Sequence, residues 1–378
     1  MRIFFVIVFL IYGLVHLYAF LRARSALSFK RSTGLYLALF MVIMTFAPFL
    51  VRISENAGLD SLAVFVSHAG YIWMGLLFLF FSTSVLIDIY RFAIFLAGAV
   101  LRSDSTGLKP SAGFSFFVPL ILSVFLSSYG FYEARNIRTE TVVIRTSKLP
   151  REIGKFKIVQ ISDVHLGLIV NKDRLERILR RVKEQSPDMI VSTGDLLDGQ
   201  LNNIGGLAEM MKGVSAPYGK FAITGNHEFY AGLEQSLGFT ELAGFRVLRG
   251  EGITANDLIN VVGVDDNAGK RFGLYTEVSE RELISGLPRE KFTLLLKHRP
   301  EIDREAMGLF DLQLSGHTHN GQIFPFRLIT RFFYPHLSGL VKLEGGSSLY
   351  VSRGSGTWGP PIRFLSPPEV TVIEIISE

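Results

Sequence analysis

Residues 157–165, KIVQISDVH, run from an apolar stretch directly into residues that commonly bind metal ions. The same arrangement recurs at four further places, each time with Asp, Asn or His after the apolar run. The five runs are 157–162, 188–193, 220–224, 292–297 and 310–315. Short apolar runs of this kind are typical of buried strands. The pattern therefore predicts a sheet whose strands each end in potential metal ligands.

Strand ends of this type are expected to meet, because ligands of open α/β sheets bind beyond the carboxyl ends of the strands. Gly194, Gly225 and Gly316 follow three of the runs and permit sharp turns and close backbone approach. Between the first two runs, apolar residues recur at helical spacing from Leu175 to Val182, with Asn171 as the expected N-cap. This order predicts a β-α-β unit.

The histidines gather at the same strand ends. Of eight histidines in the chain, five follow the apolar runs. They are His165, His227, His298, His317 and His319. The chain has no cysteine, so nitrogen and oxygen ligands must hold any metal, which favours Mn, Fe, Zn or Co. There are more ligands than one ion needs, so we predict two divalent metal ions. A purely structural role is disfavoured, because buried charges are costly unless they are paired or bind metal.

Hydrophobic and basic residues concentrate in the N-terminal part. Mean hydropathy is +0.33 over the chain, which is high for a soluble protein. Residues 1–150 carry 13 Lys and Arg against 6 Asp and Glu, whereas the remainder carries 26 against 28. The basic character thus belongs to apolar segments flanked by cations, which indicates a bilayer partner and no nucleic-acid partner. Oligomeric state cannot be derived from these features.

Four segments are apolar and long enough to span a membrane. They are residues 3–20, 33–51, 64–87 and 114–129. Residues 92–101 form a shorter apolar stretch, interpreted as interfacial or as a helix continuation, with a fifth span as the alternative. We therefore predict an all-α transmembrane region over 1–138, followed by a soluble α/β domain over 139–378.

The distribution of Lys and Arg predicts the orientation of these spans. The first loop carries four basic residues and the third carries three, whereas the second carries only Arg52. With four spans, this bias places the C-terminal domain on the periplasmic or extracellular side of the inner membrane. Arg135 and Arg138 oppose this orientation, and one miscounted span would reverse it.

The strand-end residues resemble the calcineurin-like metallophosphoesterase superfamily, whose motif order is D-x-H, GD, GNH[E/D], H and GHxH. The matching blocks begin at Asp163, Gly194, Gly225, His298 and Gly316. The flanking sequences, GHTHNGQI from Gly316 and YVSRGSGTWGPPIRF from Tyr350, resemble the membrane-associated bacterial phosphoesterases similar to YkuE and YaeI. The resemblance implies a four-layer α/β/β/α sandwich that hydrolyses phosphate esters or pyrophosphates.

The resemblance also implies the roles of the site residues. One metal would be held by Asp163, His165, Asp195 and His319, and the other by Asp195, Asn226, His298 and His317. Asp195 would bridge the two ions.

His227 would protonate the leaving group or stabilise the transition state, and Asp198 would orient it. Gly199 stands where the protein-phosphatase branch has a phosphate-gripping Arg, which argues against a phosphoprotein substrate. Arg299 and Arg353 are alternative phosphate ligands, although a structural role is favoured for each. Glu228 is expected to support its loop, and Asp265-Asp266 to form a turn.

The aromatic and basic segment 324–340 has two interpretations: a loop packed on the core, or a lipid-facing lip beside the metals. The second would suit a lipid-linked substrate, for which UDP-2,3-diacylglucosamine is an example by analogy with neighbouring branches. A membrane sensor or scaffold that uses the metal-bound fold only for binding is the alternative function. A transporter would need paired charges within the membrane, and Asp88 with Arg91 is the pair visible in the sequence.

Overall fold

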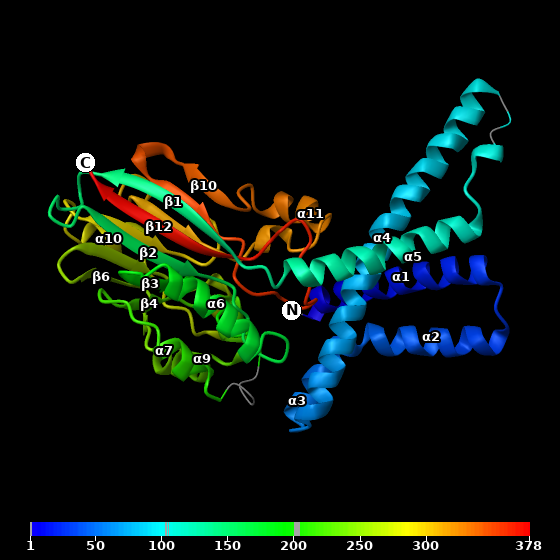
Figure 1. The fold of residues 1–378 in the computed structure, drawn as a ribbon, viewed down its shortest axis with the longest axis horizontal. Helices are drawn as coiled ribbons and strands as arrows, with labels where there is room; N and C mark the ends of the chain where they lie inside the picture. Colours follow the sequence, from blue (N-terminus) through cyan, green and yellow to red (C-terminus); the bar gives the residue numbers. More distant parts are fainter. Residues whose placement is uncertain (1, 103, 105, 200–204) are drawn as a thin grey trace. The chain divides into compact units, whose positions relative to one another are not determined.

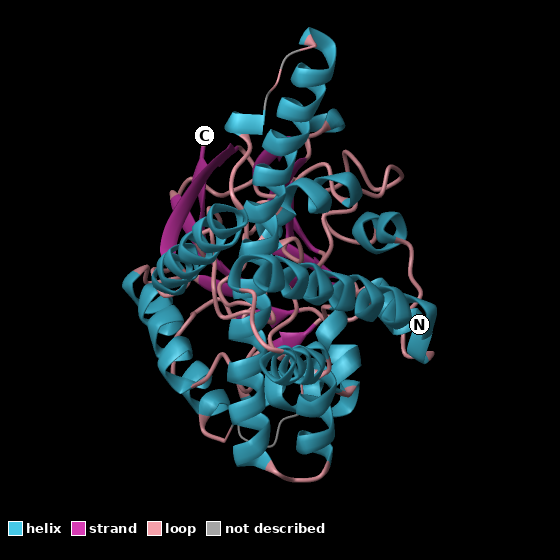
Figure 2. Cartoon of the chain, turned by 90° about the vertical axis from the view of Figure 1, so that its right-hand side faces the viewer, coloured by secondary structure: helices cyan, strands magenta, loops and turns pink. Residues whose placement is uncertain are grey.

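The computed structural model describes residues 2–102, 104, 106–199 and 205–378. The chain forms two compact units. The first comprises Met1–Phe131 and Gly359–Ile362, and the second comprises Tyr132–Trp358 and Arg363–Glu378. Within the described ranges, the strands, magenta in Figure 2, belong to the second unit only.

The first unit is helical. Its α-helices are α1 (Arg2–Leu27), α2 (Arg31–Thr45), α3 (Ala47–Asn56), α4 (Asp60–Leu101) and α5 (Ala112–Glu133). A 3-10 turn, η1 (Thr106–Leu108), precedes α5. Three helices, α1, α4 and α5, are long and apolar enough to cross a membrane. The pair α2 and α3 meets that criterion only jointly and is bent by 57° at a break, so the described residues provide three or four spans.

Helix α4 is much longer than a membrane requires. Its 42 residues correspond to about 63 Å at the usual helical rise, roughly twice the thickness of a hydrocarbon core. The predicted span 64–87 and the apolar stretch 92–101 both lie within this single helix. The helix-continuation interpretation is therefore correct, and a separate fifth span is not present among the described residues.

Polar contacts join α1 to α4. Asp88 of α4 forms an ion pair with Arg22 of α1 and accepts a hydrogen bond of 2.6 Å from the Tyr18 hydroxyl. The sequence alone pointed only to Asp88 and Arg91 and missed Arg22, because this partner comes from a helix that is distant in sequence. His16 of α1 accepts a hydrogen bond of 2.9 Å from the indole nitrogen of Trp73 in α4, which adds a second polar link between these helices.

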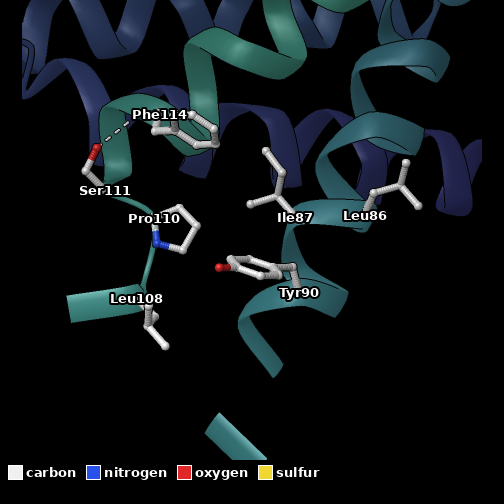
Figure 3. Close-up of a pocket in the computed structure, with 7 residues that line it drawn as sticks. All are labelled: Leu86, Ile87, Tyr90, Leu108, Pro110, Ser111 and Phe114. Carbon is white, nitrogen blue, oxygen red and sulfur yellow. Dashed lines mark hydrogen bonds between the residues drawn. The ribbon is translucent and has the colours of Figure 1, made fainter. Parts of the chain in front are cut away.

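An apolar groove runs between α4 and the start of α5 (Figure 3). Tyr90 and Phe114 line it from the two sides. The Ser111 hydroxyl, also at its edge, accepts a hydrogen bond of 3.1 Å from the backbone N–H of Phe114 and so caps the first turn of α5. The residues that line this groove include no set of catalytic groups. We therefore look for the catalytic site in the second unit.

The second unit contains two six-stranded sheets. In spatial order, the first sheet consists of β1 (Arg138–Thr146), β12 (Glu369–Ser377), β2 (Lys155–Ile161), β3 (Met189–Ser192), β4 (Lys220–Ala222) and β5 (Arg246–Val247). The second consists of β10 (Gly339–Lys342), β11 (Ser348–Val351), β9 (Leu312–Ser315), β8 (Phe292–Leu296), β7 (Ile259–Gly263) and β6 (Glu251–Ala255). Four of the five predicted runs contain one of these strands, namely β3, β4, β8 and β9, and the first run overlaps β2, which begins two residues earlier, at Lys155.

Three apolar layers hold the sheets and helices together. Buried side chains of both sheets, among them Ile158 and Leu294, form the central layer. Helices α6 (Lys172–Glu184), α7 (Leu207–Lys212) and α9 (Leu233–Leu242) cover the outer face of the first sheet (Figure 1). Helix α10 (Glu280–Ser285) packs behind the second sheet through Ile284. The predicted four-layer α/β/β/α sandwich is confirmed.

The strand directions place the predicted ligands at one end of the sandwich. Strands β2, β3 and β4 are parallel neighbours in the first sheet, and β8 and β9 are parallel neighbours in the second. The carboxyl ends of parallel neighbours lie at the same sheet edge. Asn171 is the N-cap residue of α6 as predicted, but its side chain makes no capping hydrogen bond.

Candidate metal centre

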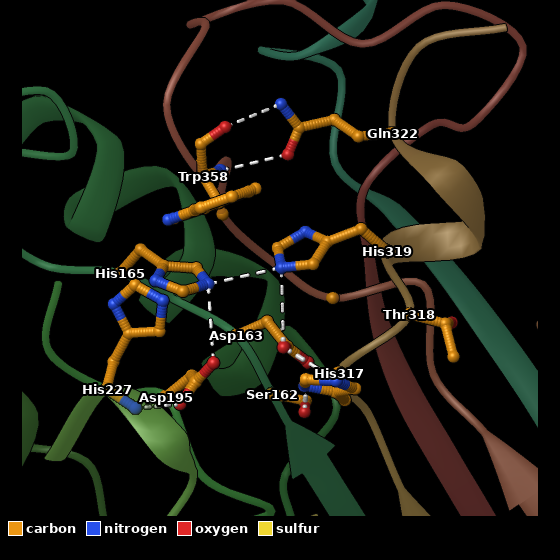
Figure 4. Close-up of polar contacts among 12 residues, drawn as sticks. Ser162, Asp163, His165, Asp195, His227, His317, Thr318, His319, Gln322 and Trp358 are labelled. Atoms are coloured by element: carbon orange, nitrogen blue, oxygen red, sulfur yellow. Dashed lines mark hydrogen bonds and ion pairs between the residues drawn. The ribbon is translucent and has the colours of Figure 1, made fainter. Parts of the chain in front are cut away.

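Buried carboxylates and imidazoles from both sheets meet beyond the strand ends. Three groups each bring their ligand atoms within 4.8 Å of one another. The groups are Asp163, His165 and His319; His165, Asp195 and His227; and Asp195, His298 and His317. Because His165 and Asp195 each occur in two groups, the three form one continuous cluster, part of which Figure 4 shows.

Asp195 stands between the two halves of the cluster. Its Oδ1 accepts a hydrogen bond of 2.8 Å from the backbone N–H of His227. Its Oδ2 lies 3.2 Å from Nε2 of His298 and 3.8 Å from Nε2 of His165. One carboxylate oxygen is thus fixed by the backbone, and the other faces a histidine of each predicted metal site.

The first predicted site is formed by residues that follow β2 and β9. Nε2 of His165 and Nε2 of His319 lie 3.1 Å apart, and Oδ1 of Asp163 lies 3.4 Å from the latter nitrogen (Figure 4). The Ser162 hydroxyl donates to Oδ2 of Asp163 over 2.5 Å. Two imidazole nitrogens and a carboxylate oxygen that converge in this way form a typical nitrogen and oxygen ligand set.

The second predicted site is formed by residues that follow β4, β8 and β9. Nδ1 of His317 lies 3.1 Å from Nε2 of His298, whose Nδ1 lies 2.8 Å from the carbonyl oxygen of Thr193. That carbonyl accepts the Nδ1 proton of His298, so Nε2 is the nitrogen that faces Asp195 and the predicted ion. Oδ1 of Asn226, the first residue of α8 (Asn226–Ala231), is buried without a hydrogen-bond partner among the described residues. An unpartnered buried carbonyl of this kind fits a metal ligand.

The backbone of the site is strained. Five of the seven predicted ligands have positive φ angles, between 47° and 69°. They are Asp163, His165, Asp195, His317 and His319. Such angles are uncommon outside glycine and cost on the order of 1–3 kcal/mol each, and they cluster at functional sites. These backbone angles therefore lower the stability of the fold, and they direct the five side chains toward one point.

Glycines leave the space that this crowding requires. A Cβ atom on Gly225 would lie 2.2 Å from Oδ1 of Asp195, and one on Gly316 would lie 2.2 Å from Oδ2 of Asp163. Both distances are far below van der Waals contact. The predicted role of these glycines, close backbone approach, is confirmed.

Comparisons with known proteins agree with this geometry. Residues 156–321 match the family model described as calcineurin-like phosphoesterase. An uncharacterised metallophosphoesterase of Aquifex aeolicus is 43% identical over 68% of this chain and 98% of its own length. The chain belongs to the calcineurin-like metallophosphoesterase family.

Two further relatives show how widely the family resemblance extends. The uncharacterised metallophosphoesterase YkuE of Bacillus subtilis is 31% identical over 65% of this chain and 88% of its own length. A zebrafish (Danio rerio) protein named transmembrane protein with metallophosphoesterase domain is 32% identical over 67% of this chain and 61% of its own length. With its apolar helices, the chain is thus a membrane metallophosphoesterase.

The electrostatics of this metallophosphoesterase site favour cations. Burial lowers the pKa of His317 to about 3 and that of His319 to about 4, so both rings are neutral at pH 7 and keep a lone pair for metal binding. Burial also acts against protonation of His298, but Asp195 outweighs it and raises the pKa of His298 to about 10. The carboxylates thus draw positive charge into the centre, which fits a site for divalent metal ions.

His227 and Asp198 form a pair beside the cluster. Oδ1 of Asp198 lies 3.1 Å from Nδ1 of His227 and also 3.4 Å from Nδ1 of His165. Burial opposes protonation of His227, but Asp195 and Asp198 outweigh it and raise the pKa of His227 to about 10. These two carboxylates thus favour the protonated form of His227. The contact between Asp198 and His165 was not predicted from the sequence.

Glu228 ties the loops of the site together and belongs to none of the three ligand groups. Its carboxylate accepts backbone hydrogen bonds of 2.7 to 3.3 Å. The donors are the N–H groups of Asp195, Leu196, Leu197 and Gly225. Glu228 thus connects the loop after β3 to the loop after β4, as expected of a supporting residue.

Arg363 is a site residue that the sequence analysis missed. Its side chain is completely buried, and it donates to backbone carbonyl groups that include those of Gly356 and Arg353, over 2.7 and 2.6 Å. Nη2 also lies 3.1 Å from Nδ1 of His319. The arginine of the tail motif, which supported the resemblance, was a signal that could have drawn attention to this residue.

The other two arginines considered as phosphate ligands differ from each other. Arg353 forms ion pairs with Glu140 and Glu369, which supports a structural role. Arg299 binds Asp266 over 2.7 Å and donates to the Tyr334 hydroxyl over 3.1 Å. Asp266 is buried in this ion pair, so describing it only as a turn residue was incomplete.

Aromatic side chains stand beside His227. The rings of Tyr230 and Trp358 lie 5.5 and 6.1 Å from its imidazole. The side chain of Gln322 holds the backbone N–H and carbonyl of Trp358 through two hydrogen bonds of 2.9 Å (Figure 4). Trp358 remains 54% exposed, so the fixed loop presents an accessible aromatic surface next to the predicted proton donor.

Proposed function

We propose that this protein hydrolyses a phosphate ester or pyrophosphate bond at two divalent metal ions. The observation that carries the proposal is the arrangement around Asp195, whose Oδ2 faces His165 on one side and His298 on the other. One ion would be held by Asp163, His165, Asp195 and His319. The other would be held by Asp195, Asn226, His298 and His317. The nitrogen and oxygen ligands suit Mn, Fe, Zn or Co, and manganese is the ion used in the tests below.

The bound ions would lower the pKa of a water molecule that attacks phosphorus. Their positive charge would also stabilise the negative charge on the phosphate oxygens. The chain itself supplies the remaining chemistry. Asp198 holds His227 over 3.1 Å and favours its protonated form, so His227 is placed to protonate the departing oxygen. A general acid of this kind typically contributes about 10²–10⁴-fold in rate. Tyr230 and Trp358 would contact the leaving group.

We further propose a lipid-linked or cell-envelope substrate, with UDP-2,3-diacylglucosamine as one example of the class. Only residues 134–137 separate the end of α5 from the start of β1. Such a short connection keeps the soluble domain close to the bilayer in which α5 resides. A substrate anchored in that bilayer would therefore be at high local concentration.

The side of the membrane depends on the bent pair α2 and α3. If the pair crosses the bilayer, four spans and the Lys and Arg bias place the domain on the periplasmic or extracellular side, which we propose. If the pair re-enters instead, three spans place the domain in the cytoplasm. Because the chain lacks cysteine, a Leu242→Cys variant in intact cells distinguishes the two. We expect labelling by a membrane-impermeant maleimide, and labelling only after lysis would contradict the proposal.

Hydrolysis of bis-p-nitrophenyl phosphate by the full chain with Mn²⁺ tests the activity. We expect turnover that His227→Ala reduces by about 10²-fold or more without changing the metal content. His336→Ala is the matched control, since His336 belongs to none of the three ligand groups. If both metals bind but no phosphoester is cleaved, the protein is a binding module and the proposed activity is wrong.

A further inference from the structure

Helix α11 (Phe326–Phe333) exposes an unusually apolar surface. Every residue of the helix except Thr330 is exposed, and none is buried. Phe332 is 89% exposed and Phe333 is 75% exposed. The structure therefore corrects, for residues 326–333, the interpretation of the segment 324–340 as a loop packed on the core, whereas Leu337 further along the segment is buried. Large exposed apolar side chains that are contiguous usually mark an interaction surface.

The helix is amphipathic, with a basic polar side. Phe326, Ile329 and Phe333 recur at helical spacing and share one side. Arg327 and Arg331 are one turn apart on another side, and the helix contains no acidic residue. Aromatic residues on one side and arginines on the other are typical of helices that lie in a membrane interface, where the cations meet anionic lipid head groups.

The same helix is fixed to the metal centre at both ends. The backbone of Gly321, which closes η3 (His319–Gly321), approaches α11 so closely that a Cβ atom there would lie 2.3 Å from Cα of Arg327. Tyr334 follows the helix directly, and its ring lies 5.2 Å from that of the predicted ligand His317. Whatever contacts α11 is therefore brought close to the predicted metals.

We propose that α11 is a membrane-docking helix that inserts its apolar side into the bilayer holding the chain's own spans. The apolar α1, α4 and α5 are long enough to cross a bilayer, and four residues connect α5 to β1. The basic charge of α11 matches an anionic lipid surface. A second copy of the chain would have to cover two arginines that have no acidic neighbour on the helix, so the bilayer is the occupant that fits both sides.

Docking would also define how a lipid substrate reaches the site. An anionic lipid leaving the bilayer beside α11 would find Tyr334 and Arg299 between the membrane surface and His317. This second step rests on the proposed hydrolase function, whereas the membrane contact does not. Two separate measurements therefore test them.

The absence of cysteine makes the membrane contact directly measurable. Phe332→Cys places a single bimane label on α11, and Leu242→Cys, at a residue of α9 that is 65% exposed, provides the matched control. The full-length chain is reconstituted into nanodiscs of phosphatidylcholine and phosphatidylglycerol, with or without nitroxide-labelled acyl chains. We expect at least about twofold stronger quenching at position 332 than at position 242, because only an inserted helix reaches the acyl region.

Equal quenching of the two labels would overturn the membrane-docking role. Protection of the label only in discs that contain two chains would also overturn it, because a second copy would then be the occupant. The activity measurement uses Phe332→Ser with Phe333→Ser. Hydrolysis of a phosphoester lipid in vesicles should fall by about tenfold, while that of soluble bis-p-nitrophenyl phosphate should stay unchanged. If neither substrate is cleaved even by the unaltered chain, the proposed function fails, but the quenching experiment still decides the role of α11.

Discussion

Arg363 and His319 are joined by a hydrogen bond of 3.1 Å between Nη2 of the guanidinium and Nδ1 of the imidazole. Because arginine can only donate, Nδ1 of His319 is the acceptor, so the neutral ring carries its proton on the Nε2 that faces His165 and Asp163, and a cation at Nε2 would have to displace that proton. Arg363 is buried and has no carboxylate partner among the hydrogen bonds of the described residues; backbone carbonyls occupy its other donors. It thus fixes the orientation of a predicted metal ligand.

Replacing Arg363 should weaken metal binding more than its distance from the reacting atoms suggests. For Arg363→Lys, which keeps the charge but loses the fixed fork of donors, we expect Mn²⁺ affinity to fall by about 10–100-fold, as is typical when a partner of a metal-binding histidine is lost. Isothermal titration of the metal-free protein measures this. Circular dichroism checks the fold, and a folded variant with unaltered affinity would rule out the orienting role.

Asp198 should affect rate more than metal content. Asp198→Asn removes the negative charge that holds His227 in its protonated form, so we expect kcat to fall by about 10–100-fold with little change in KM. Because Asp198 also touches His165, the metal content must be measured in parallel. Full activity of Asp198→Asn would show that the pair has no part in the reaction.

Gly316 tests the need for space at Asp163. A methyl group there would lie 2.0 Å from the Ser162 hydroxyl and 2.2 Å from Oδ2 of Asp163, so Gly316→Ala should displace that carboxylate and eliminate one metal ion per chain. Gly238→Ala is the matched control, since outside the backbone of its own helix and its two chain neighbours nothing lies within 4 Å of a Cβ at that position. Metal analysis after gel filtration compares the two, and equal metal content would contradict the packing argument.

Glu228 is predicted to act on stability. Glu228→Gln replaces a carboxylate that accepts four backbone hydrogen bonds with a group that has one acceptor and a misplaced donor. We expect the free energy of unfolding of the soluble domain to decrease by about 2–4 kcal/mol. Urea denaturation followed by tryptophan fluorescence in detergent measures the change. A decrease below about 0.5 kcal/mol, the usual size of surface effects, would contradict the supporting role.

The sequence predicted those parts of the protein that depend on local pattern. An apolar run followed by Asp, Asn or His indicates both a buried strand and the position where it ends. The approximate positions of β2, β3, β4, β8 and β9, and the potential metal ligands that follow them, could therefore be predicted. The α/β/β/α layers followed from the family resemblance. The glycine positions were predictable because close backbone approach leaves few alternatives.

The remaining features depend on contacts between distant segments, which local pattern does not encode. Arg363 reaches His319 across 44 residues, and Arg22 reaches Asp88 across 66. The positive φ angles at Asp163 and His317 are imposed by the packed loops against local preference. The break between α2 and α3 at Phe46 is likewise not evident from hydropathy, since the predicted span 33–51 runs across it and covers the apolar parts of both helices.

The central claim is that Asp195 is shared by two metal ions. The most direct test is the metal content of the full-length protein and of its Asp195→Asn variant, measured by inductively coupled plasma mass spectrometry after loading with Mn²⁺ and removal of free metal. Our account predicts two ions per chain in the unaltered protein and fewer than one in the variant, because both sites lose a ligand and the shared charge. No bound metal in the unaltered protein, or two ions retained by a folded Asp195→Asn variant, would contradict it.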